Sequence, residues 1–281
     1  MNYKIGIDYG GTKIEGILIN DKGEEILRKR LSYEKNYHSS INTVRDLVLE
    51  FDNHTNSKSP VGVGIPGSSS KENGLIKNAN CIWLNEKPFK KDLENALERE
   101  IKVMNDANCF ALSEAIDGSG ANYNTVWGVI IGSGFGGSFV NNKKVVEGIN
   151  QVAGDWGHQP LPYPTKEELD LDLKCNVNNC GRPLCAEQFI SGIGFTNIFN
   201  KKYNTNFTTK EIVGLELNGD ERAKKEFDLY EDRFARLIAV MIGIVDPDVI
   251  ILGGGMSNIE RLYLNIPKLL PKYTFSDKVR N

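Results

Sequence analysis

The chain has 281 residues, of which 40% are apolar and 25% charged, with a formal net charge of −3 at pH 7. Because acidic and basic residues are interspersed and no apolar run approaches roughly eighteen residues, these values argue against nucleic-acid and membrane partners. The first residues, MNYKIGIDYG, also lack the apolar length and the small-residue cleavage site of a signal peptide. We therefore expect a cytoplasmic globular protein that acts on a small molecule.

The first third of the chain predicts strands joined by tight turns. Residues 4–8 and 13–19 alternate apolar and other residues, and the turn sequence NDKG separates the second run from a third. The following segments predict a helix over 40–51, a buried strand at 61–66, an amphipathic helix over 88–100, a strand at 101–105 and a helix that Asp106 opens.

A second meander begins at Thr125 and repeats the pattern of strand, glycine turn, strand and Asn-Asn turn about 120 residues after the first. Residues 150–190 are irregular in pattern. From Glu221, apolar residues recur at helical spacing, at Phe227, Tyr230, Phe234, Leu237, Ile238, Met241 and Val245. We expect a core helix there, then a buried strand at 248–252 and a glycine loop; a core without any ligand fits this pattern equally well.

Two halves that each open with a glycine-turn hairpin indicate a duplicated α/β architecture with a cleft between two lobes. We expect an N-terminal α/β lobe over residues 1–117, with the first phosphate loop, and a C-terminal α/β lobe over 118–281, with the second.

Four glycine-rich turns follow apolar strands, with the sequences DYGGTK, GVGIPG, IGSGFGG and LGGG. Glycine lets backbone N–H groups approach a phosphate because it has no Cβ. Residues 62–67 and 132–137 match G-x-G-x-x-G, but a dinucleotide fold needs a helix directly after the glycines. Pro66 interrupts the first match and a hairpin follows the second, so the pattern argues against a Rossmann fold.

Asp8 precedes the first glycine turn and Lys13 closes it. A carboxylate beside a phosphate is unfavourable unless a cation lies between them, so Asp8 is a candidate Mg²⁺ ligand acting through water, and Lys13 supplies positive charge. The alternative is a plain hairpin turn that Asp8 caps.

Eight motifs, in order from Lys4 to Tyr273, resemble those of the ROK family of sugar kinases and repressors, most closely its bacterial fructokinase-like members. They are IGIDYGGTK, VGVGIPGS, KNANCIWLN, NDANCFALSEA, GSGFGG, AGDWGHQPLP, CGRPLCAEQFISGIGF and DPDVIILGGGMSN. The resemblance implies the two-lobed actin-like (ribonuclease H-like) ATPase fold and transfer of the ATP γ-phosphoryl group to a sugar hydroxyl. Repressor members carry a helix-turn-helix ahead of the first strand, and only three residues precede Lys4, so we expect a kinase.

Asp106 occupies the position at which the family carries its general base. A simple N-cap is the alternative, and both roles are compatible because the helix dipole keeps the carboxylate ionised. By the same resemblance Asn105 hydrogen-bonds the sugar, and Gly67 allows a close backbone approach to it. Asn80 either contacts the sugar or has an ordinary loop role.

The family also binds the sugar with a Glu-x-Gly-His motif and a later glutamate. Here Asp155 replaces the first glutamate and is one methylene shorter, whereas His158 and Glu187 match. This replacement leaves the inherited sugar specificity open. The resemblance places the ATP phosphates at Gly10, Gly11, Thr12 and Lys13 and at Gly132, Ser133 and Gly134, and the adenosine near Gly253, Gly254 and Gly255.

Three of the five cysteines lie in the stretch KCNVNNCGRPLC, residues 174–185. An odd count in a reducing compartment argues against a disulfide framework. The family's pattern C-x-C-G-x-x-G-C-x-E implies a structural Zn²⁺ held by His158, Cys175, Cys180 and Cys185, a closed tetrahedral set. Two departures, Leu184 in place of glycine and the displaced Cys175, leave a degenerate site with ordinary thiols as the alternative.

The predicted activity is a fructokinase that uses ATP and Mg²⁺. The alternatives are a glucokinase or N-acetylhexosamine kinase, or a sugar-binding protein without turnover. The last is favoured by the C-terminal sequence KYTFSDKVRN, after which similar proteins continue with a His-Gly-Asp-Ser-Ser-Gly stretch and a helix. We expect a truncated or shortened chain that keeps its catalytic residues, and a homodimer, as is common in the family.

Overall fold

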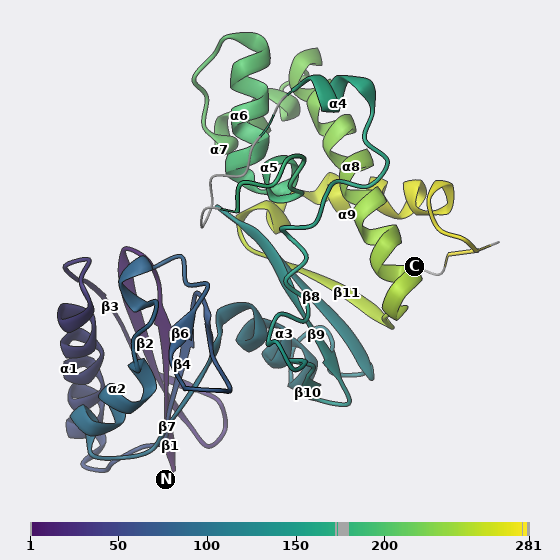
Figure 1. Ribbon diagram of the computed structural model, residues 1–281. Helices are drawn as coiled ribbons and strands as arrows, with labels where there is room; N and C mark the ends of the chain where they lie inside the picture. The colour runs from purple at the N-terminus through teal and green to yellow at the C-terminus, as the bar shows by residue number, and fades with distance from the viewer. Residues whose placement is uncertain (1, 172, 174–179, 277, 280–281) are drawn as a thin grey trace. The chain divides into compact units, whose positions relative to one another are not determined.

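The computed structural model describes residues 2–171, 173, 180–276 and 278–279 (Figure 1). The chain divides into two compact units. The first extends to Cys109 and includes Gly148–Gln151, and the second comprises Phe110–Glu147 and the chain from Val152. Within the described residues, no helix combines the length and the apolar character that a membrane span requires.

The first unit contains a five-stranded sheet with the order β3-β2-β1-β4-β7. Its antiparallel meander consists of β1 (Tyr3–Tyr9), β2 (Lys13–Asn20) and β3 (Glu25–Ser32). Two strands run parallel to β1, namely β4 (Val61–Ile65) and β7 (Ile101–Asn105). A short hairpin, β5 (Ser68–Ser69) and β6 (Ile76–Lys77), follows β4.

Two helices cover one face of this sheet, α1 (Tyr37–Thr55) and α2 (Phe89–Leu97), with the 3₁₀ turn η1 (Ile82–Leu84) before α2 (Figure 1). Ile5, Ile7 and Tyr9 alternate along β1 and are buried in the resulting core. Asn36 caps α1 by accepting a hydrogen bond from the Ser39 N–H. All strands and helices predicted for this region are confirmed, with α1 longer than expected at both ends.

The second unit contains a four-stranded sheet with the order β10-β9-β8-β11. Its strands are β8 (Thr125–Ile131), β9 (Phe135–Asn141), β10 (Lys144–Val145) and β11 (Val249–Gly253). The hairpin turn after β9 uses Asn142 and Lys143, whose φ angles are 49° and 61°. It lies one residue beyond the predicted Asn-Asn pair, because Asn141 pairs with Lys144 and both central residues of such a turn need positive φ.

Helices surround this second sheet, and the longest is the predicted core helix. Its α-helices are α3 (Asp106–Ile116), which begins in the first unit, α4 (Lys166–Asp170), α5 (Glu187–Ile190), α6 (Gly192–Tyr203), α7 (Thr209–Leu217), α8 (Glu221–Val245) and α9 (Glu260–Leu269). Two 3₁₀ turns flank α9, η3 (Gly255–Asn258) and η4 (Leu270–Lys272). Of the predicted apolar positions on α8, Met241 and Val245 are half-buried and the others are buried. The 150–190 region is largely irregular as expected, but it also contains α4 and α5.

Candidate functional site

The first glycine turn joins β1 to β2 in a conformation that requires glycine. The Gly10 N–H donates to the Lys13 carbonyl oxygen at 3.0 Å, and a Cβ at Gly10 would lie 2.8 Å from that oxygen. The Tyr33 hydroxyl donates to the Gly10 carbonyl at 2.9 Å and so fixes the turn from one side. Gly11, Thr12 and Lys13 are exposed. An exposed backbone turn on a fixed support suits an anion such as a phosphate.

Asp8 lies directly before this turn and opposite Glu15 on the neighbouring strand. Desolvation, and then the charge of Glu15, raises the pKa of Asp8, while Arg30 acts in the opposite direction. Glu15 itself is paired with Arg30 and with Arg28, the latter at 2.6 Å. A carboxylate with this balance of charges gains from a nearby cation, in line with the predicted Mg²⁺ role.

The parallel strands β1, β4 and β7 bring three segments to one edge of the sheet. Across these parallel strands, Asp8 pairs with Gly64 and Ile65 pairs with Asn105. Asp8 and Asp106 therefore lie at the same edge of the sheet. The charge of Asp8 is one of the causes that raise the pKa of Asp106.

Asp106 is accessible to solvent, but the surrounding protein reduces its hydration. Desolvation is the main cause that raises the pKa of Asp106 to about 6, and a hydrogen bond from the Ala107 N–H to its Oδ1, at 2.8 Å, opposes the shift. A carboxylate that is reachable and has a pKa just below neutrality has the properties of a general base.

The residue that caps α3 is Asn105. Its Oδ1 accepts a hydrogen bond from the Asn108 N–H at 3.2 Å, the i to i+3 contact of an N-cap, and its Nδ2 donates to the Gly67 carbonyl at 3.2 Å. The N-cap interpretation of Asp106 is therefore wrong, because the residue before it already makes the cap.

The backbone segments that contain Gly67 and Asn80 lie side by side. A Cβ at Gly67 would lie 2.8 Å from the Cα of Ala79, and the Asn80 N–H donates to the Pro66 carbonyl at 3.0 Å. Asn80 is exposed, whereas Gly67 is buried. Asn105 is connected to the same segment by its hydrogen bond to the Gly67 carbonyl.

In the second unit, the structure brings together Asp155, His158 and Glu187. Glu187 is only 5% exposed, and its Oε2 accepts a hydrogen bond from the Phe135 N–H at 3.0 Å. Desolvation and then Asp155 raise the pKa of Glu187, while His158 lowers it. Its Oε1 is buried and has no hydrogen-bond partner among the described residues. A buried acceptor in that state suits a bound hydroxyl group.

Backbone pairing joins the His158 loop to the segment before Glu187. Leu161 N–H donates to Leu184 O at 2.8 Å, Ala186 N–H to Gln159 O at 2.9 Å, and Glu187 N–H to Gly157 O at 2.8 Å. A Cβ at Gly157 would lie 1.8 Å from the Phe135 carbonyl oxygen, so no other residue type fits there without displacing the loop.

The ligand atoms of His158, Cys180 and Cys185 all lie within 4.8 Å of one another. The His158 Nδ1 lies 3.5 Å from the Cys185 Sγ, and two ligands of a tetrahedral zinc ion, one nitrogen and one sulfur, are separated by about 3.6 Å. Cys175, the fourth predicted ligand, lies outside the described residues. Leu184 has a φ of 54°, which explains why glycine is usual at this position.

The two glycine turns of the second unit that are predicted to bind the nucleotide meet at the end of β8. Gly132 N–H donates to Gly134 O at 2.9 Å, and Gly192 N–H donates to Gly132 O at 2.8 Å. Gly254 has a φ of 83°, and a Cβ there would lie 2.5 Å from the Ile131 carbonyl oxygen. The two predicted nucleotide loops are therefore adjacent. Gly192, to which the sequence assigned no role, is hydrogen-bonded to the first of them through Gly132.

A sequence model described as the ROK family matches residues 4–281. The chain belongs to the ROK family. It is 35% identical, over 95% of its length and 89% of the relative, to the N-acetyl-D-glucosamine kinase of Citrobacter koseri. It is 38% identical, over 95% of its length and 88% of the relative, to the protein of the same name from Histophilus somni.

Solved ROK structures share the fold. The ROK hexokinase from Thermus thermophilus superposes with a TM-score of 0.82 at 22% identity, covering 96% of this chain and 88% of that one. The ROK glucokinase from Streptomyces griseus, solved with glucose and AMPPNP, gives 0.80 at 22% identity, covering 100% of this chain and 92% of that one. The predicted actin-like fold and the predicted class of ATP-dependent sugar kinase are confirmed, but the two relatives cited are not named fructokinases.

Two supporting residues of this ROK protein were missed by the sequence analysis. Tyr33 donates to the Gly10 carbonyl of the first glycine turn, and Arg236 donates to the carbonyls of Pro162 and Tyr163 just beyond the His158 loop. Neither residue belongs to a motif, and both act through contacts between segments far apart in the sequence.

Proposed function

We propose that this ROK protein transfers the γ-phosphoryl group of ATP to a hydroxyl of N-acetyl-D-glucosamine. The observation that carries the choice of sugar is the identity of 35–38% over 95% of the chain to relatives with that name. The sequence-based preference for fructose rests on motif resemblance alone, so fructose becomes the competing substrate in the test.

Asp106 is the proposed catalytic base. Its carboxylate is largely ionised at neutral pH, since its pKa is raised only to about 6. It accepts the proton of the sugar hydroxyl while that oxygen forms a bond to the γ-phosphorus, and the bond from the γ-phosphorus to the leaving oxygen of ADP breaks. The sugar phosphate and ADP are the products, and the proton stays on Asp106 until solvent removes it.

The remaining proposed roles follow from the surroundings of each residue. Glycine-turn N–H groups from Gly10 to Lys13 and from Gly132 to Gly134 would bind phosphates, with Gly253 to Gly255 near the adenosine. Asp8 would hold Mg²⁺ through water. The proposed sugar ligands are Gly67, Asn80, Asn105, Asp155, His158 and Glu187. Glu187 Oε1, buried without a described partner, is the best-supported acceptor for a sugar hydroxyl. The proposal includes two functional lobes, residues 1–117 and residues 118–281.

Structural zinc is proposed on His158, Cys175, Cys180 and Cys185. The clustering of three of these ligand atoms and the spacing of 3.5 Å between His158 Nδ1 and Cys185 Sγ support it. Four protein ligands would leave no open position, so the ion would fix the loop rather than activate water. A homodimer is the proposed assembly, which sedimentation measurements test.

A coupled assay of ADP release tests the substrate. N-Acetyl-D-glucosamine, N-acetyl-D-mannosamine, glucose and fructose are compared at saturating MgATP, and N-acetyl-D-glucosamine is expected to give the highest kcat/KM. A higher kcat/KM for fructose would reject the proposed sugar. Calorimetric sugar binding without ADP release at any MgATP concentration would reject the kinase itself.

A further inference from the structure

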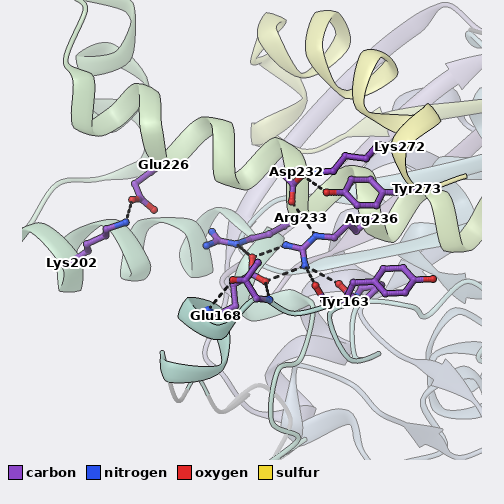
Figure 2. Close-up of polar contacts among 11 residues, drawn as sticks. Tyr163, Glu168, Lys202, Glu226, Asp232, Arg233, Arg236, Lys272 and Tyr273 are labelled. Atoms are coloured by element: carbon purple, nitrogen blue, oxygen red, sulfur yellow. Dashed lines mark hydrogen bonds and ion pairs between the residues drawn. The ribbon is translucent and has the colours of Figure 1, made fainter.

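A buried ionic network inside the second unit joins α4 to α8 (Figure 2). Glu168, Arg233 and Arg236 are only 2%, 4% and 2% exposed. Glu168 Oε1 accepts hydrogen bonds from Arg236 Nη2 at 2.6 Å and from Arg233 Nε at 2.8 Å. A second acid, Asp232, lies beside Arg236, with its Oδ2 3.2 Å from the Arg236 Nε.

Arg236 contacts two backbone carbonyl groups in addition to Glu168. Its Nη1 donates to the carbonyl oxygens of Pro162 at 2.8 Å and Tyr163 at 2.7 Å, which are backbone groups of an irregular segment (Figure 2). The carboxylate of Glu168 also accepts a hydrogen bond from the Thr165 N–H at 2.9 Å. One guanidinium thus fixes the chain from Pro162 to the start of α4.

This fixed segment continues directly from the loop that carries Asp155 and His158. Pro160 forms a β-bridge with Cys185, and Leu161 N–H donates to Leu184 O. Trp156 and Leu161, buried at 5% and 2% exposure, are the loop's apolar anchors. Arg236 therefore supplies the polar anchor at the loop's C-terminal end.

Stability alone does not explain such a network. Buried ion pairs lose much of their Coulomb energy to desolvation, and apolar residues of similar volume often stabilise a protein equally well. A planar guanidinium can contact two carbonyls and a carboxylate together, which an apolar side chain cannot. The feature that needs Arg236 is the placement of the loop backbone.

We propose that Arg236 is a positioning residue for the sugar site: it holds Pro162 and Tyr163 so that Asp155 and His158 stay opposite Glu187. This inference rests on the proposed function, which assigns these three residues to the sugar. Its consequence is that weakening the Arg236 contacts lowers sugar affinity and leaves the nucleotide turns unaffected.

The test compares Arg236→Lys with the matched control Arg233→Lys. Both variants keep the positive charge on the same helix beside Glu168, but only the first loses the two carbonyl contacts. Arg236→Lys is expected to raise KM for N-acetyl-D-glucosamine about tenfold, with KM for ATP within about twofold. Arg233→Lys is expected to leave both KM values within about twofold. Equal rises in both variants, or a rise in KM for ATP alone, would overturn the proposal.

Hydrogen–deuterium exchange of the peptide covering residues 153–163 supplies a readout that does not depend on turnover. Exchange there is expected to be faster in Arg236→Lys and unchanged in Arg233→Lys, measured against peptides from α8 as internal reference. Unchanged exchange in Arg236→Lys overturns the positioning role. Faster exchange in Arg236→Lys with an unchanged KM for the sugar overturns the link to the sugar site. If the wild-type protein is inactive on every sugar, the proposed function itself has failed. Glu226→Gln, which weakens the separate Lys202–Glu226 pair in Figure 2, controls for general loss of stability.

Discussion

The raised pKa of Asp106 predicts a distinctive pH dependence of catalysis. The proposed base is active when ionised, and its pKa is raised from 3.8 to about 6, so activity is expected to appear as the pH rises through about 6. At pH 5 a group with a pKa of about 6 is about 9% ionised, whereas an ordinary Asp is above about 90% ionised. We therefore expect kcat/KM for the sugar at pH 5 to be about a tenth of its value on the plateau above pH 7.

The assay is kcat/KM at saturating MgATP from pH 4.5 to 8.5, with circular dichroism at each pH to verify folding. Asp8→Asn serves as a companion variant, because removing the neighbouring negative charge should move the midpoint to lower pH even though overall activity falls. A profile that is flat down to pH 5 in folded enzyme would refute the assignment of Asp106 as a base with this pKa. A midpoint that Asp8→Asn moves to higher pH would refute the electrostatic argument.

Three further predictions concern parts of the site other than Asp106. Tyr33→Phe removes the hydroxyl that donates to Gly10 and should raise KM for ATP about fivefold. The control Tyr37→Phe, which loses only a hydrogen bond to Asp92, should leave KM for ATP unchanged. Equal effects of the two variants would contradict the reasoning. Gly254→Ala places a Cβ against a carbonyl at positive φ and should lower the free energy of unfolding, measured in urea melts, by about 2 kcal/mol. Gly255→Ala, with open space at its Cβ, should change that free energy by less than about 0.5 kcal/mol. Similar losses in the two variants would refute the prediction. Metal analysis should give about one zinc per wild-type chain and far less in Cys180→Ser, and less than about a tenth of an equivalent in both would end the zinc proposal.

The sequence predicted the strands well because their signals are local. Alternation along β1 and β2, together with glycine and asparagine turns, identifies a meander without reference to the rest of the chain. Helices α6 and α7 were not predicted. α6 begins with Gly192 and contains Gly194, both poor helix formers, and it is stabilised by burying Phe195 and Phe199 in the core.

The site was predictable where residue type is decisive and unpredictable where tertiary contacts decide. Adjacent Asn105 and Asp106 are both good capping residues, so the sequence could not say which side chain makes the i to i+3 cap of α3. Tyr33 reaches a carbonyl 23 residues away and Arg236 reaches one 74 residues away. No periodicity or motif encodes contacts of that kind.

The most direct test of the central claim is ³¹P NMR of a mixture of wild-type protein, MgATP and N-acetyl-D-glucosamine, set beside the same mixture with Asp106→Asn. We predict that wild type forms a sugar phosphate and ADP, and that Asp106→Asn forms them at a rate lower by at least about a hundredfold. Calorimetry should show that Asp106→Asn still binds the sugar. The account is contradicted if no sugar phosphate forms with wild type, or if Asp106→Asn forms it within tenfold of the wild-type rate.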